Sequence, residues 1–357
     1  MAMTDELLQA NIRKILDMAV YAPSGSNSQP WKFIVRDNAI SIIATPEKDH
    51  PVFNYRNRGT YVAHGALIEN IIIAAPHFGY RPRVIAFPDK NNLLITAEII
   101  LDKSDIAKSD LFDAIVKRAT NRRPYKKNPL TKEEKTGLFR DMSSDGAIQY
   151  TFIENPEQIR QLGQAISANE IIMLENKKLH RAFFDELVWT QKEEEIKRTG
   201  LYLRTLELDP PQAKALSLFK YWPVMRFANI LGMSRKIANE NANVYSACSG
   251  MTVFFCPDDD KEFIEIGRRM QRLWLRATAM GLSAQPVIGL FYMWQSVELG
   301  KQQLLSAAHM QLMDTANRLA VATTKIPSNM IIAMLLRIGY GGEPSARSSR
   351  KSAEYTI

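Results

Sequence analysis

The segment APSGSNSQPW, residues 22–31, carries residue types suited to holding a ligand through hydrogen bonds. Pro23 fixes its own backbone, and Gly25 lets the chain approach a ligand closely because it has no Cβ atom. Hydrogen-bond donors and acceptors are supplied by Ser24, Ser26, Asn27 and Gln29. Trp31 would anchor the end of the segment in the core. The same composition is typical of a tight turn after a helix, so a purely structural role stays open.

Two basic segments could bind an anion. Six of the eleven residues in KRATNRRPYKK, residues 117–127, are basic. The segment continues the helical pattern SDLFDAIVKRAT, so Arg118 and Arg122 would share one helix face and converge on one anion, with Thr120 adding a hydroxyl. The C-terminal ARSSRKSAEY contributes Arg347 and Arg350. Each segment alone is typical of a solvated surface, so a site requires that folding brings them together.

The segment AQPVIGLF, residues 284–291, resembles a strand that stops at Gly289, where a glycine can expose backbone N–H groups to a flat ligand. Cys248 and Cys256 form no C-x-x-C pair, and the five histidines lack a metal-ligand spacing. Cys248 also has no recognisable partner histidine, so we interpret it as buried structure. The sequence therefore indicates neither a metal centre nor a protein nucleophile.

Composition limits the classes of function. The chain has 357 residues, 46% apolar content and a formal charge of +8, which allow one large or two ordinary domains with a basic surface. Such a surface suits nucleic acid, a membrane face or a phosphorylated ligand, or simply a soluble protein that is basic. No zinc-finger, RNP-like or helix-turn-helix pattern supports nucleic acid. The polar N-terminus and the lack of a long apolar run predict a cytoplasmic protein without a membrane partner.

An internal repeat is visible between residues 65–79 and 267–281. Both segments begin and end with glycine, carry apolar residues at matching positions, and lead to a valine after a short turn. A helix ending at a glycine and followed by a strand fits both. Five further strands are predicted in NAISIIA, NLLITAEIIL, IQYTFI, SGMTVFFC and NMIIAMLLRIG. The pattern predicts two related α+β domains.

The polar stretch 104–110 suggests a boundary, giving domains at residues 1–110 and 111–357. Residues 180–240 have helical patches and no counterpart in the first half. We interpret them as an insertion, either a lid or an ordinary helical subdomain. The lid hypothesis expects its aromatic residues to cover the site; these are Phe219, Tyr221, Trp222 and Phe227.

Four motifs together resemble the flavin-dependent nitroreductase family. APSGSNSQPWKFIV is similar to that family's APS…QPW turn, and RATNRRPY to its basic opening. PVIG is similar to its isoalloxazine-facing turn, and LLRIGYGGEP…RSSR to its C-terminal ending. Each half of the chain has a different part of the site, as in a fused dimer. The arrangement, with its insertion, resembles the Acg-like branch, which implies one FMN per chain held between two domains.

The resemblance also implies roles for individual residues. The family's basic opening places Arg118, Thr120 and Arg122 on the FMN phosphate, the ribityl chain and the N1/O2 edge. Arg347 or Arg350 corresponds to the C-terminal phosphate ligand. The turn from the opposite subunit corresponds to Pro23, Ser24, Gly25, Asn27 and Gln29. The segment along the flavin face corresponds to Pro286, Val287, Ile288 and Gly289. Asn241 lies near the position of a family asparagine on the pyrimidine edge.

The resemblance further implies an enzyme in which NAD(P)H reduces FMN and an electron-poor acceptor, a nitroaromatic or a quinone, reoxidises it. The alternative is an FMN-sequestering or redox-regulatory protein, in which the insertion closes over the flavin and prevents the nicotinamide from stacking on it. In both cases we expect a small-molecule ligand and a monomer with an internal pseudo-dimer, with a higher oligomer left open.

Overall fold

The computed structural model describes residues 2–142, 146–301 and 303–356. Its helices are α1 (Ala2–Ala19), α2 (Arg58–Ala74), α3 (Phe112–Lys117), α4 (Lys132–Leu138), α5 (Pro156–Glu175), α6 (Lys177–Glu186), α7 (Gln191–Lys197), α8 (Pro210–Phe219), α9 (Trp222–Ile230), α10 (Met233–Ser246), α11 (Glu262–Ala279), α12 (Gly289–Trp294) and α13 (Ala307–Thr324). Its strands are β1 (Trp31–Arg36), β2 (Ala39–Ala44), β3 (Tyr80–Ala86), β4 (Ile95–Lys103), β5 (Gln149–Ile153), β6 (Leu187–Val188), β7 (Leu201–Tyr202), β8 (Gly250–Cys256), β9 (Ser283–Pro286), β10 (Ile331–Gly339) and β11 (Tyr355–Thr356). The predicted α+β class is confirmed.

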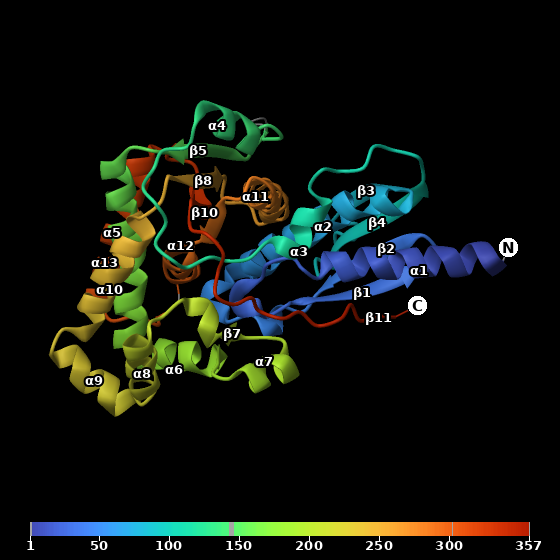
Figure 1. Cartoon of the computed structure of the whole chain (residues 1–357). Helices are drawn as coiled ribbons and strands as arrows, with labels where there is room; N and C mark the ends of the chain where they lie inside the picture. The colour runs from blue at the N-terminus through green and yellow to red at the C-terminus, as the bar shows by residue number, and fades with distance from the viewer. Residues whose placement is uncertain (1, 143–145, 302, 357) are drawn as a thin grey trace.

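The first sheet has the strand order β11-β1-β2-β4-β3. Its β1, β2, β4 and β3 come from the first 103 residues and pair antiparallel, whereas β11 at the end of the chain pairs parallel to β1. Figure 1 shows the C-terminal segment crossing from the second half of the molecule back to this edge. The chain's last residues are therefore held beside the residues that follow α1.

The second sheet, β5-β8-β10-β9, is antiparallel throughout. Every residue of β8 is buried, and its two faces contribute to different cores. Phe254 and Cys256 belong to the core around α2 and α11, whereas Val253 and Phe255 belong to the core beneath α5 and α13. A strand covered on both faces explains why SGMTVFFC is a continuous apolar run without polar alternation.

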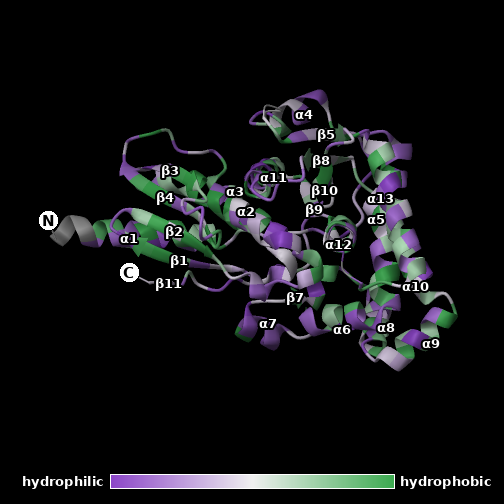
Figure 2. Cartoon of the chain, turned by 180° about the vertical axis from the view of Figure 1, so that it is seen from behind, coloured by the Kyte–Doolittle hydropathy of each residue, from purple (hydrophilic) through white to green (hydrophobic). Residues whose placement is uncertain are grey.

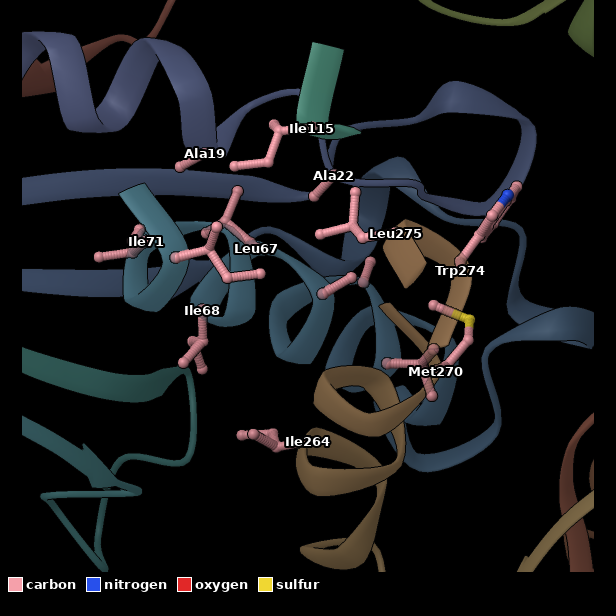
Figure 3. Packing of buried hydrophobic residues seen from close by; sticks show 14 of the residues in the cluster. Ala19, Ala22, Leu67, Ile68, Ile71, Ile115, Ile264, Met270, Trp274 and Leu275 are labelled. Atoms are coloured by element: carbon pink, nitrogen blue, oxygen red, sulfur yellow. The ribbon is translucent and has the colours of Figure 1, made fainter. Parts of the chain in front are cut away.

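Helices α2 and α11 cross in the middle of the molecule, between the two sheets (Figure 1). A Cβ atom on Gly65 would lie 1.9 Å from the carbonyl oxygen of Ile264, and one on Gly267 would lie 2.1 Å from that of Val62. The two glycines that begin the sequence repeat thus face each other at the crossing. Figure 3 shows the packing there, with Leu67 of α2 near Leu275 of α11.

The repeat prediction is confirmed on both sides of this crossing. Gly79 and Gly281, which end the two repeats, adopt left-handed backbone conformations with φ of 84° and 73°. Each then leads into a strand, β3 or β9. The five other predicted strands correspond to β2, β4, β5, β8 and β10. Residues 104–110 contain neither helix nor strand, so we propose the division into residues 1–110 and 111–357 as two domains.

None of the helices in the described part of the chain is long and apolar enough to cross a membrane.

Candidate functional site

A cavity of about 660 Å³ lies between the two halves of the chain. The first half contributes the turn at residues 23–28 and the N-terminal part of α2. The second half contributes residues 285–289, the middle of α5 and the end of α6, while Met270 and Trp274 of α11 line the wall beside the helix crossing. Both halves enclose the cavity, and the turn and residues 286–289 that the sequence motifs singled out lie in its lining.

A smaller pocket of about 80 Å³ adjoins this cavity. Ser24, Thr120 and Arg122 line both spaces, which places the two side by side. Arg118, Arg347 and Arg350 line the smaller one. Folding therefore brings the two basic segments together, although about 220 residues separate them in the sequence.

The arginines of this pocket repel each other. Arg118 is buried, its Nη2 donates to the carbonyl oxygen of Tyr21 at 2.6 Å, and its guanidinium lies over the Trp274 ring. Burial, together with the charges of Arg350 and Arg347, places the pKa of Arg118 well below its usual value. Burial likewise lowers the pKa of Arg350 to about 10. Among the described atoms, the Nε groups of Arg118 and Arg350 have no hydrogen-bond partner. A bound anion would offset the repulsion between the arginines and would accept hydrogen bonds from the two Nε groups.

The turn at residues 23–29 is strained and is held by hydrogen bonds from outside it. Ser26, Asn27 and Gln29 all have positive φ, at 43°, 58° and 52°, which non-glycine residues rarely adopt. Asn27 donates to the carbonyl oxygen of Ser349 at 3.1 Å. Gln29 donates to the carbonyl oxygen of Arg198 at 2.6 Å and accepts from the Lys351 backbone N–H at 3.0 Å. The turn thus attaches both the C-terminal segment and the insertion to the site.

Gln29 lines neither pocket and is a positioning residue in this geometry, whereas Asn27 lines the smaller pocket and also holds the C-terminal segment. Pro23 and Ser24 line both pockets, and Gly25 lines the larger one. Trp31 is buried, as predicted.

The predicted helical continuation from Arg118 to Arg122 is wrong. Helix α3 ends at Lys117, and Arg118 is extended, with φ −61° and ψ 129°. Thr120 forms a parallel bridge with Ala284, and the Asn121 N–H donates to the Ala284 carbonyl oxygen at 3.2 Å. Pairing beside β9 therefore replaces the helix. Arg118 and Arg122 still meet at the smaller pocket, but an extended chain brings them there.

Residues 286–289 line the larger cavity. The Val287 N–H donates a hydrogen bond to the Leu335 carbonyl oxygen at 3.0 Å. A Cβ atom on Gly289 would lie 3.1 Å from the Asn169 side chain, so glycine allows the chain to pass close to α5 here. Beside this wall, Arg122 donates to the Thr205 carbonyl oxygen at 3.0 Å, which links it to the insertion. Burial lowers the pKa of Arg122.

Sequence reasoning missed Glu170, a cavity-lining carboxyl on α5. Its Oε1 accepts from the Tyr245 hydroxyl at 2.5 Å and from Asn241 Nδ2 at 3.2 Å, whereas its Oε2 is buried without a partner. Burial raises the pKa of Glu170 to about 7. Asn241 itself does not line either pocket in the described structure and instead lies behind Glu170. Glu170 is one of three glutamates on α5 and belongs to none of the sequence motifs, so the sequence did not single it out.

Two further carboxyls were missed. Asp49 accepts hydrogen bonds from the Ser28 and Thr60 hydroxyls, each at 2.5 Å. Glu186 accepts from the Ser26 hydroxyl at 2.5 Å. Burial raises the pKa of both carboxyls, and each lines the larger cavity. Neither belongs to a motif, because the chain positions them through the turn at residues 23–28.

The segment 180–240 divides into two parts. Phe183, Glu186, Thr199 and Gly200 line the larger cavity, and Leu201 and Thr205 line the smaller one. The expectation that the aromatic cluster covers the site is wrong, because none of its four described side chains lines either pocket. Tyr221 and Phe227 are instead more than 60% exposed. The residues of this segment that line the two pockets therefore lie between 183 and 205.

Within the described residues, no group of three or more His, Cys, Asp and Glu side chains could hold a metal ion. Cys248 and Cys256 are both buried and free.

The sequence of the chain is similar to sequences of the nitroreductase family. A family described as "Putative TM nitroreductase" matches residues 1–56. Over 282 residues the chain is 23% identical to "Uncharacterized protein MT1398" of Mycobacterium tuberculosis (strain CDC 1551 / Oshkosh), covering 78% of this chain and 38% of that protein. It is 29% identical over 119 residues to "Putative NAD(P)H nitroreductase Rv3131" of strain ATCC 25618 / H37Rv, covering 32% of this chain and 34% of the relative.

The chain is also 27% identical over 121 residues to "Putative NAD(P)H nitroreductase acg" of Mycobacterium tuberculosis, covering 33% of this chain and 37% of that protein. The chain thus spans little more than a third of the length of these curated relatives. A solved nitroreductase with bound FMN from Bacteroides fragilis is 11% identical, with a TM-score of 0.37, covering 70% of this chain and 99% of that chain. A TM-score of this size does not establish a common fold. The sequence matches confirm the resemblance to the nitroreductase family and, within it, to the Acg-like proteins.

Proposed function

We propose that this chain binds one FMN and uses it to transfer electrons from NAD(P)H to an electron-poor acceptor, a nitroaromatic or a quinone. The observation that carries the proposal is the arginine pocket that adjoins the larger cavity. A pocket of this kind suits a terminal phosphate, and the cavity beside it suits a flat organic group. The names of the Acg-like relatives, which are called putative NAD(P)H nitroreductases, support the same reading.

The residues of the smaller pocket fit a phosphate group. Arg118 and Arg350 each have a buried Nε without a partner, and Arg347 lies in the same wall. Since guanidinium groups bind phosphate with several parallel hydrogen bonds, a phosphate would offset much of the positive charge gathered in this pocket. We assign both Arg347 and Arg350 to this role, because both line the pocket.

The larger cavity would hold the remainder of the cofactor. Thr120 and Arg122 lie at the junction of the two pockets, where the group that links a phosphate to a ring system would pass. Residues 286–289 provide a backbone wall, and Pro23, Ser24 and Gly25 face it from the first half. When bound, FMN would supply the hydride and electron chemistry, for which no side chain of this site is suited. The family resemblance implies that the Arg122 guanidinium would stabilise the negative charge that a bound flavin gains on reduction.

A second candidate function is FMN sequestration, and one observation favours it. Residues 183–205 are fastened to the first half by the Ser26–Glu186, Asn27–Arg198 and Gln29–Arg198 hydrogen bonds. A cover held by three such contacts would limit the access of a nicotinamide to the cavity. The two candidates share the cofactor and differ in whether the reductant reaches it.

One experiment tests both proposals. The purified chain, reconstituted with FMN, is quantified for released flavin and is then mixed anaerobically with NADPH or NADH while the visible spectrum is followed. We expect one FMN per chain and weaker binding of riboflavin, which lacks the phosphate. Rapid bleaching supports the oxidoreductase, and bound flavin that resists NAD(P)H but accepts electrons from dithionite supports sequestration. A chain that binds neither flavin, or two per chain, would refute the cofactor assignment.

A further inference from the structure

The helical hairpin α8–α9 exposes an apolar stripe that the fold leaves uncovered. Large apolar side chains recur every three residues along the hairpin and are exposed to solvent. They are Leu218, Tyr221, Val224, Phe227, Ile230 and Leu231, with exposed fractions from 42% to 76%. Residues three apart on a helix are neighbours, so Val224, Phe227 and Ile230 form one row on α9. Monomeric soluble proteins rarely expose contiguous apolar surface of this kind without a partner.

Helix α9 is apolar on both of its faces. Its inner face is already used, since Met225 and Ala228 are buried against Leu174 of α5. The Asn229 side chain reinforces this attachment by donating to the Leu174 carbonyl oxygen at 2.8 Å. An ordinary surface helix would place polar residues on the outer face. The apolar outer face therefore does not serve the packing of this chain.

The segment that carries the stripe has charges of one sign. Residues 210–239 contain no Asp or Glu. Their basic residues are Lys214, Lys220, Arg226, Arg235 and Lys236, and all five are exposed. Basic side chains that surround exposed aromatic and aliphatic groups are the pattern of helices that lie in the interface of an anionic bilayer. Two copies of this surface would repel each other, which argues against self-association through it.

The hairpin also lies where a flat surface could reach it. Figures 1 and 2 show α8 and α9 at one end of the molecule, away from both termini and from the first sheet. Figure 2 shows strongly hydrophobic residues on α9 together with a few hydrophilic ones. A projecting end suits contact with a membrane surface better than a groove would.

We propose that α8–α9 is a docking surface for anionic lipid bilayers. Phe227, Ile230 and Leu231 would enter the boundary between headgroups and acyl chains, and the basic residues would contact the lipid phosphates. The attachment is to one leaflet and involves no spanning segment. It departs from the sequence-based expectation of no membrane partner, which considered spanning segments alone. The inference is independent of the proposed oxidoreductase activity.

The hairpin is connected to the site by His180 of α6. The imidazole Nε2 lies 2.8 Å from the Phe219 carbonyl oxygen, and the ring packs edge-on against Trp222. The same helix places Phe183 and Glu186 in the cavity wall. A membrane-bound hairpin would thus hold the covered side of the cavity close to the lipid surface.

The test is co-sedimentation of the full chain with vesicles of phosphatidylcholine alone or with about one third phosphatidylglycerol. We expect binding to the anionic vesicles that weakens as salt is raised. Two double variants, Phe227→Ser/Ile230→Ser and Arg226→Glu/Arg235→Glu, should each lower the partition coefficient roughly tenfold or more. All four positions are exposed, so unfolding temperatures should stay close to that of the wild type.

Matched controls separate the proposal from general effects of hydrophobicity and charge. Leu7→Ser removes an exposed apolar side chain from α1, at the other end of the molecule. Lys90→Glu/Lys132→Glu changes the net charge by the same amount as the arginine pair, and both lysines are exposed. Wild-type binding by these controls supports the proposal. It is overturned if the wild type binds neither vesicle, if the hairpin variants bind as well as the controls, or if the hairpin variants only dissolve a dimer.

Discussion

Glu170 offers a test of the site that does not depend on a bound cofactor. Its Oε2 is buried without a partner, and its pKa is raised to about 7 from an ordinary value of 4.5 because burial outweighs the two hydrogen bonds from Tyr245 and Asn241. The folded protein therefore retains this proton at pH values where the unfolded chain has lost it. Between these two values the folded state binds more protons, so the free energy of unfolding falls as the pH rises.

The size of the effect follows from the two pKa values. The difference between 7 and 4.5 corresponds to at most about 3 kcal/mol of stability, fully present below pH 4.5 and lost by about pH 7 to 8. Glu170→Gln keeps the shape and a neutral group at all pH values. The variant should be close to the wild type at pH 4.5 and more stable than it at pH 8.

The measurement is urea unfolding of both proteins between pH 4.5 and 8 at equal cofactor content. The informative quantity is the difference in unfolding free energy between variant and wild type, since all other titrating groups cancel in it. Glu6→Gln, which changes an exposed carboxyl on α1, serves as the control. A Glu170→Gln difference that stays constant across this range would refute the assignment of a buried neutral carboxyl.

Three further predictions concern the cofactor site and the helix crossing. Arg118→Ala should weaken FMN binding by roughly 10- to 100-fold, because a charged contact to the phosphate is lost. Arg122→Ala should weaken binding and also lower the flavin reduction potential. Equal potentials for Arg122→Ala and the wild type in a potentiometric titration would contradict this role of Arg122. Gln29→Ala should weaken FMN binding although Gln29 does not line the pockets. Limited proteolysis should show faster cleavage near residues 198 and 351, because the two hydrogen bonds of Gln29 end there. Unchanged cleavage would count against the positioning role of Gln29. Gly65→Ala should lower the unfolding free energy by about 3 kcal/mol or more, because the new Cβ would lie 1.9 Å from a backbone oxygen. Gly137→Ala is the control, since its Cβ would meet only the flexible end of Met280 at 3.3 Å. Similar stabilities of the two variants would refute the close crossing of α2 and α11.

The sequence allowed most of the fold to be predicted, because its signals are local or repeated. Apolar runs bounded by Asn, Asp or Gly identified the main strands, and the glycines at the ends of the repeat marked matching helices. The continuation of α3 through Arg118 was mispredicted for the opposite reason. Its helical pattern is sound locally, but Thr120 and Asn121 pair with Ala284, far along the chain, and that pairing decides the local conformation.

The site was predictable only in part. Motif residues identified the turn, the basic segments and the wall at residues 286–289. The carboxyls Asp49, Glu170 and Glu186 could not be found, since each is placed by contacts with residues distant in the sequence. The aromatic residues of α8–α9 show the same limit: their apolar character was recognised, but composition alone could not show that Tyr221 and Phe227 point away from the cavity.

The repeat also explains why one site per chain is the expected outcome. If the constant offset of 202 residues between the two repeats is extended past their last glycines, Val84 to Phe87 correspond to Pro286 to Gly289. Val287 is buried and lines the cavity, whereas its counterpart Ile85 is 37% exposed and lines neither pocket of the described structure. Gly289 lets the chain pass Asn169, but Phe87 in the equivalent place packs edge-on against Tyr61. Residues of the insertion and of both basic segments line the larger cavity or the pocket that adjoins it. The proposed fused pseudo-dimer would therefore enclose a single site, and the flavin-to-chain ratio tests the same asymmetry that these residues show.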